Sequence, residues 1–73
     1  MNTVIKKDNA TVIFPNVAKL HVMSTITCFS ITISEMANIN PLMDAVKDGI
    51  LHSFSVSGTE IRISSYTKYT ELQ

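Results

Sequence analysis

The 73-residue sequence contains one cysteine, no tryptophan, two glycines and two prolines. With only Cys28, the chain cannot form an internal disulfide, and no group of cysteines and histidines has the spacing of a structural zinc site. The two glycines, Gly49 and Gly58, do not belong to a phosphate-binding loop of the GxGxxG or GxxxxGK[ST] type. We therefore expect no disulfide, no metal and no cofactor.

Charge is also scarce, because charged residues make up only 16% of the chain and the formal net charge is zero. A neutral chain has no general attraction for phosphate backbones or anionic lipids. No apolar run approaches the roughly 18 residues of a membrane-spanning helix, and residues 1–14 lack the apolar core of a signal peptide. A single free thiol fits a reducing compartment, so we expect a soluble, cytoplasmic protein that binds no membrane.

The length indicates one small domain, residues 1–73. A domain of this size buries only about 60% of the surface that its unfolded chain exposes. Small folds usually gain further stability from disulfides, a metal or a partner subunit. Since the first two are not expected, an oligomer or a bound partner remains, although domains of this size also fold alone.

The clearest local pattern lies in residues 51–64, LHSFSVSGTEIRIS, where apolar and polar residues alternate around one glycine. Glycine suits the second position of a two-residue type I′ turn, so we expect a hairpin with the loop Ser57-Gly58. One face of this hairpin is mainly apolar and the other polar. The predicted pairs are Val56 with Thr59, Phe54 with Ile61 and His52 with Ile63 on one face, and Ser55 with Glu60 and Ser53 with Arg62 on the other.

A short α-helix is expected before this hairpin, over about residues 41–48. Asn40 suits the N-cap, Pro41 the first helical position, and Gly49 the position that ends a helix. The apolar stripe at helical spacing consists of Leu42, Ala45 and Val46, flanked by Ile39 and Ile50. About two turns are too few to be stable alone, so the helix must pack on a sheet.

The first half of the sequence predicts strands. Two short apolar runs flank Asp8-Asn9, which suits a tight turn. A second hairpin follows if Ser24-Thr25 is a loop, and its core face then holds Ala18, Leu20, Val22, Phe29 and Ile31. The reverse face holds His21, Met23, Ile26 and Cys28 near the turn, followed by Lys19, Ser30 and Thr32.

Two alternatives to the second hairpin stay open, because Ser-Thr is a poor pair for a tight turn. A β-bulge near Cys28 would flip the strand and bring both apolar sets into one core. Residues 24–34 also fit one long continuous strand. Even with the hairpin, the reverse face has a possible cover in the N-terminal hairpin, whose apolar residues point both ways: Val4, Ile5, Val12 and Ile13.

Together these elements predict an α+β domain. We expect a mostly antiparallel sheet of five to six short strands, with the short α-helix packed on one face. The opposite face should carry mainly serine and threonine, and the corner formed by Met23 and Ile26 is its one apolar spot.

No arrangement of side chains indicates catalysis. His21 and Cys28 face each other in the second hairpin, but no third group that would orient the histidine is visible. A free cysteine commonly behaves as a small hydrophobe. Asp44 and Asp48 lie one helical turn apart on the solvent face, where carboxylates are usually just hydrated. We therefore expect no enzymatic activity and no small-molecule substrate.

These absences favour a small protein-interaction module that binds a protein partner or a second copy of itself as an inhibitor or adaptor. Proteins of this size and kind are common among the accessory genes of phages and plasmids. Exposed apolar patches mark interaction sites, and methionine adapts to partners of different shape. The predicted partner-binding residues are accordingly those of the reverse face: His21, Met23, Ile26 and Cys28.

The alternative function is nucleic-acid binding. The C-terminal segment places two tyrosines beside a lysine, and aromatic rings next to basic groups stack on single-stranded nucleic acids. The residues for this alternative are Arg62, Tyr66, Lys68 and Tyr69. No basic groove accompanies them in the sequence, so a protein partner is favoured over nucleic acid.

Overall fold

The computed structural model describes all 73 residues and contains one α-helix and seven strands in two antiparallel sheets. The α+β class is confirmed, whereas the prediction of five to six strands in one sheet was too low and missed the second sheet. The helix is α1, Asn40–Lys47. The strands are β1 (Thr3–Lys7), β2 (Ala10–Phe14), β3 (Ala18–Val22), β4 (Ile26–Thr32), β5 (Leu51–Ser57), β6 (Glu60–Tyr66) and β7 (Thr70–Leu72).

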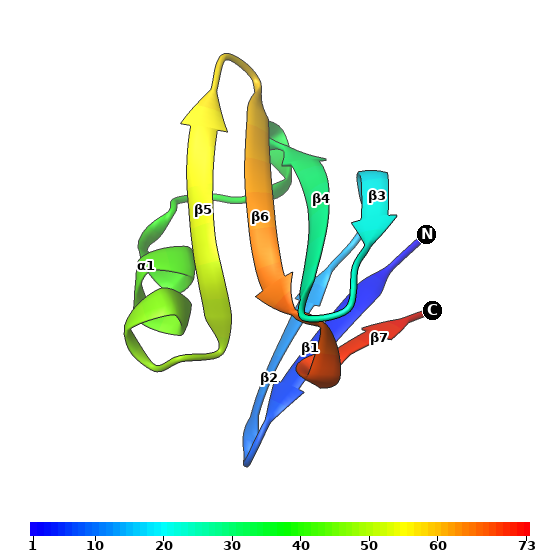
Figure 1. Ribbon diagram of the computed structural model, residues 1–73. Helices are drawn as coiled ribbons and strands as arrows, with labels where there is room; N and C mark the ends of the chain where they lie inside the picture. The colour runs from blue at the N-terminus through cyan, green and yellow to red at the C-terminus, as the bar shows by residue number, and fades with distance from the viewer.

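The smaller sheet has the strand order β2-β1-β7 and joins the two ends of the chain. The predicted turn at Asp8-Asn9 is confirmed, since Lys7 pairs with Ala10 and Asp8 has a positive φ of 55°. β7 pairs with the other side of β1, and Asn2 and Gln73 exchange two backbone hydrogen bonds of 2.9 Å. The two termini therefore lie side by side (Figure 1).

The larger sheet has the order β3-β4-β6-β5. The predicted hairpin around Ser24-Thr25 is present, with Val22 opposite Thr27 and His21 opposite Cys28. A β-bulge does occur, but it lies in β3 rather than near Cys28, at Lys19, whose φ is 54°. Beyond the bulge the predicted register is wrong by one residue, since Ala18 pairs with Ser30 instead of Ile31.

The β5–β6 hairpin forms with a different turn from the predicted one. Ser57 pairs with Glu60, so the loop is Gly58-Thr59 and not Ser57-Gly58. Gly58 has a φ of 62° while Thr59 does not have a positive φ, which is the pattern of a type II′ turn with glycine first. Phe54 consequently pairs with Ile63. The register moves by two residues, an even number, so the predicted apolar and polar faces are both retained from Ser53 to Ser64.

One more irregularity lies at the start of β5. The predicted pairing of His52 with Ile63 is wrong because Ile63 pairs with Phe54, and a further register shift lies between Leu51 and Ser53. The ring of His52 instead contacts that of Tyr66, with 5.6 Å between the ring centroids.

Helix α1 ends where the sequence predicted. Gly49 has a φ of 74°, and the amides of Gly49 and Ile50 donate to the carbonyl oxygens of Val46 and Ala45 at 3.1 and 2.8 Å. This is the Schellman arrangement, which needs a left-handed residue and so favours glycine. At the other end the N-cap is Ile39 rather than Asn40, and the Asn38 side chain accepts a hydrogen bond from the Asn40 amide at 2.9 Å.

The hydrophobic core lies on one side of the larger sheet. The β1–β2 hairpin crosses behind this sheet, and α1 lies against β5 (Figure 1). The rings of Phe14 and Phe29 meet across the two sheets with centroids 5.3 Å apart. The core consists of Ile5, Phe14, Phe29, Ile31, Leu42, Ala45, Ile50, Leu51, Ile61 and Ile63.

Two residues of the predicted core are outside it. Ala18 is exposed and Val22 is 55% exposed, while Leu20 is half-buried against the core. Ala18 lies beyond the bulge, where its pairing with Ser30 places it on the face away from the core. Leu20 and Val22 belong to β3, which is an edge strand of the larger sheet. The covering hairpin and helix therefore bury the central strands β4 and β6 much more fully than β3.

Candidate functional site

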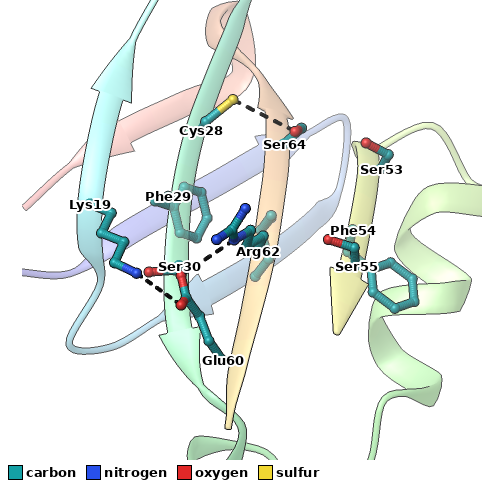
Figure 2. Close-up of a pocket in the computed structure, with 11 residues that line it drawn as sticks. Lys19, Cys28, Phe29, Ser30, Ser53, Phe54, Ser55, Glu60, Arg62 and Ser64 are labelled. Atoms are coloured by element: carbon teal, nitrogen blue, oxygen red, sulfur yellow. Dashed lines mark hydrogen bonds and ion pairs between the residues drawn. The ribbon is translucent and has the colours of Figure 1, made fainter. Parts of the chain in front are cut away.

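The candidate site is the face of the larger sheet that points away from the core. Directly paired residues in antiparallel strands share a face, so Ser53, Ser64 and Cys28 lie side by side across β5, β6 and β4. This surface includes a hollow of about 440 Å³, and Figure 2 shows the residues that line it. We call the whole surface the open face and define it by Lys19, His21, Met23, Ile26, Cys28, Ser30, Ser53, Ser55, Glu60, Arg62, Ser64 and Tyr66.

The middle of the open face consists of short polar side chains. Serines come from three strands, and the Cys28 thiol lies 3.7 Å from the Ser64 hydroxyl. Ser30 is buried and donates to the Ala18 carbonyl at 3.3 Å, whereas Ser53 and Ser55 are exposed. Serine side chains lose little conformational entropy when they are immobilised, and each can donate and accept hydrogen bonds. This region is therefore shallow and adaptable in its hydrogen bonding.

One end of the open face holds a small group of charges. The Lys19 ammonium lies 2.9 Å from one oxygen of Glu60, and Nε of Arg62 lies 3.7 Å from the other. The hydrogen bond from Lys19 is the main reason that the pKa of Glu60 is lowered, against partial burial that raises it. Two cations thus share one carboxylate, and this end carries only a small positive charge.

The opposite end of the open face holds the predicted partner-binding residues. His21 lies opposite Cys28, and Ile26 lies opposite Tyr66. Met23 is 44% exposed, His21 is exposed, and Ile26 and Cys28 are half-buried. The N-terminal hairpin packs on the other side of the sheet, against Phe29, so it does not cover these residues.

The residues of the nucleic-acid alternative are only partly brought together. The rings of Tyr66 and Tyr69 meet edge to face, 6.1 Å apart, and the Lys68 ammonium lies 4.9 Å from the Tyr69 centroid. Lys7 approaches the same ring at 5.9 Å. Arg62 lies beside Glu60 at the other end of β6, separated from Tyr66 by Ser64 on the same face.

The serines of the open face were missed as site residues, although the sequence contained a signal for them. Ser53 and Ser55 were assigned to the polar face of the last hairpin, and that face is correct. Polar faces of this kind are usually just hydrated, so the sequence pattern alone does not mark them as a site. The structure shows that they pair with Ser64 and Arg62 of β6, which in turn pair with Cys28 and Ser30 of β4.

The open face has no evident catalytic arrangement. His21 and Cys28 are cross-strand neighbours, but the hydrogen-bond partner of the thiol is Ser64. No group of three or more His, Cys, Asp or Glu side chains is placed to hold a metal ion. The one α-helix, with eight residues, is too short to cross a membrane.

Comparison with known proteins adds no further assignment, because no family model, curated protein or solved structure matches the chain.

Proposed function

We propose that the protein is a small non-enzymatic interaction module, which binds a protein partner through the open face. The observation that carries this proposal is that α1 and the smaller sheet both pack on the same side of the larger sheet. The other side is left uncovered across all four strands. Its hollow and its exposed side chains are then available to a partner.

The composition of the open face supports a protein partner. In an average protein interface tyrosine, methionine and arginine are enriched, whereas lysine, glutamate and serine are depleted. Met23, Arg62 and Tyr66 fit this composition, whereas the serines do not. The binding loops of antibodies use serine for adaptable hydrogen bonds and tyrosine for rigid contact area. The open face combines several serines with Met23, Arg62 and Tyr66.

The electrostatics favour a protein over nucleic acid. Lys19 and Arg62 are both placed at Glu60, so this carboxylate offsets part of their positive charge and weakens their attraction for a phosphate. The ring of Tyr69 is already contacted by Lys7, Lys68 and Tyr66, which leaves less of it for a stacked base. The partner is a protein or a second copy of the chain, and the mode of action is that of an inhibitor or adaptor in the cytoplasm.

Site-specific photo-crosslinking in the organism that carries this chain tests the proposal. A benzophenone amino acid at Ser55 should form a discrete protein adduct, because Ser55 is exposed on the open face opposite Arg62. The matched control is the same amino acid at Lys47, which is exposed on α1. Adding Arg62→Glu to the Ser55 variant should weaken the adduct several-fold.

Three results would contradict the proposal. The first is no adduct at Ser55, and the second is an equal adduct at Lys47. The third is an adduct that disappears on nuclease digestion, which would indicate nucleic acid as the partner. A circular dichroism melt of each variant shows whether the fold is retained.

A further inference from the structure

A second surface with binding character lies at the free edge of the smaller sheet. Asn2 and Gln73 exchange both backbone hydrogen bonds, so alternate residues of β1 from Asn2 onward direct their backbone groups toward β7. The other residues of β1, including Ile5, must direct their backbone N–H and C=O groups toward β2. Since Ile5 pairs with Val12, the backbone groups of Thr11 and Ile13 point out of the sheet.

The outward backbone groups of β2 have no partner. The backbone N–H and C=O groups of Thr11 and Ile13 point away from β1, and neither residue forms a backbone hydrogen bond to any element other than β1. Each residue therefore offers one N–H and one C=O to an added strand. The side chain of Ile13 is also 60% exposed.

Edge strands in native proteins are usually protected by charge, proline, bulges or short length. Within the smaller sheet, the other edge strand, β7, has three residues and carries Glu71. In the larger sheet, β3 carries the bulge at Lys19 and α1 lies against β5. β2 has five residues, ATVIF, with neither a charge nor a proline among them.

An apolar hollow adjoins the same edge. It has a volume of about 260 Å³ and lies between β2 and the segment that leads into α1. Its apolar lining includes Val12, Phe14, Met36, Ala37 and Pro41. Side chains of a strand added to β2 would alternate between the two faces of the sheet, and those on the side of Val12 and Phe14 would reach this hollow.

One uncompensated charge lies at the rim of the hollow. Glu35 contributes to its lining, is exposed, and forms no ion pair with any basic side chain. Its only polar contact is with the Asn16 amide, which donates to it at 3.4 Å. A ligand with a basic residue near this position would therefore be favoured over one with an acidic residue.

We propose that β2 and the adjoining hollow bind an extended peptide segment of a partner protein by strand addition. In this mode, backbone hydrogen bonds give affinity and pockets for alternate side chains give specificity. The segment would pair with Thr11 and Ile13, place an apolar side chain in the hollow, and carry a lysine or arginine near Glu35. This inference rests on the proposed role in protein binding but uses a separate surface, so either can fail alone.

Selection of displayed random peptides on the immobilised protein tests the inference. Selected peptides should alternate apolar and polar residues and include a lysine or arginine, and they should bind Ile13→Pro at least tenfold more weakly than the unmodified protein. Proline removes the outward N–H, and edge strands tolerate proline where that N–H faces solvent. Ile13→Thr is the matched control, because it keeps the N–H and a β-branched side chain.

A second variant leaves the strand itself intact. Ala37→Arg places bulk and positive charge in the hollow, and it should also weaken binding at least tenfold. This variant decides the outcome if Ile13→Pro fails to fold, which thermal melting would show. Glu35→Arg should shift the selected peptides from basic to acidic residues.

Several outcomes would overturn the inference. One is the absence of any enriched peptide family, and another is binding that none of these variants weakens. Selected peptides that respond only to Arg62→Glu would place the site on the open face, so that the proposed function stands while this inference falls. A concentration-dependent dimer in sedimentation that Ile13→Pro dissociates would identify a second copy, rather than a partner peptide, as the occupant.

Discussion

The side chain of Thr3 offers a sharp test of the packing between the two sheets. Thr3 lies on β1, the central strand of the smaller sheet, and its relative exposure is 0%. Its hydroxyl oxygen is buried and has no hydrogen-bond partner. A buried polar group without a partner loses its hydration and gains nothing in return, which costs about 1–3 kcal/mol.

Thr3→Val replaces this hydroxyl with a methyl group of similar size. We expect the free energy of unfolding to rise by about 1–2 kcal/mol, because the desolvation penalty is removed and apolar contact is gained. For a domain of this length, each 1 kcal/mol shifts the melting temperature by about 4–8 °C. Urea unfolding followed by circular dichroism measures the free energy, and thermal melting provides an independent check.

Thr27→Val is the matched control, since Thr27 is also buried on a strand, with 1% exposure. Its hydroxyl lies 2.8 Å from that of Thr67, which donates its own proton to the Met23 carbonyl at 2.9 Å. Thr27 must therefore be the donor to Thr67, and removing it should lower stability by about 1 kcal/mol. If both substitutions change stability in the same direction, or if Thr3→Val lowers it, the assignment of an unpartnered Thr3 hydroxyl is refuted.

Two further predictions concern the core and the charged end of the open face. Phe29→Ala should lower the free energy of unfolding by about 3–5 kcal/mol, because Phe29 is buried and its ring packs against Phe14 across the two sheets; a loss below about 1 kcal/mol in urea unfolding would contradict this packing. Lys19→Ala should raise the pKa of Glu60 toward its ordinary value of 4.5, because the hydrogen bond from Lys19 is the main cause of the lowered pKa. A lowered pKa in the folded state stabilises the fold above the unfolded pKa, and that contribution is lost as the pH falls through the folded pKa, so the variant should lose less stability on acidification. An NMR titration of the Glu60 carboxyl carbon measures the pKa, and an unchanged midpoint would contradict the argument.

The helix and the hairpins could be predicted because their signals are local. Pro41 and Gly49 act within one turn of the helix ends, and Asp8-Asn9 joins strands that are adjacent in the sequence. The loop at Ser24-Thr25 was predicted correctly as a hairpin, although its residues are weak turn formers. The pairing of β3 with β4 indicates that burial of the alternating apolar residues stabilises this hairpin more than the unfavourable Ser-Thr turn destabilises it.

The features that were missed depend on smaller energy differences or on distant contacts. The sequence around Gly58 fits two hairpin registers that place the same residues on each face. The alternation of apolar and polar residues therefore does not distinguish a type I′ turn from a type II′ turn. The bulge at Lys19 changes the register without a glycine to mark it. β7 has only three residues and pairs with β1 at the other end of the chain, so no local pattern predicts it.

The candidate site divides in the same way. The sequence predicted that His21, Met23, Ile26 and Cys28 share a face, and the pairing of β3 with β4 confirms that arrangement. The serines of β5 and β6 join that face only because β4 pairs with β6 rather than with another strand. Which residues adjoin across β4 and β6 is a property of the sheet order, which the alternation within each strand does not contain.

The sequence alone determined which residues lie together on most of each hairpin face, because strand side chains alternate with a period of two. The exceptions are Ala18 and His52, which the irregularities in β3 and β5 move to the open face. Only the tertiary structure decided which face is covered. Helix α1 and the β1–β2 hairpin had two sides of the larger sheet available, and they pack together on the side of Phe29 and Ile31 because that side buries the larger apolar area. The uncovered serine side follows from that choice, whereas the free edge of β2 follows from the strand order β2-β1-β7 of the smaller sheet.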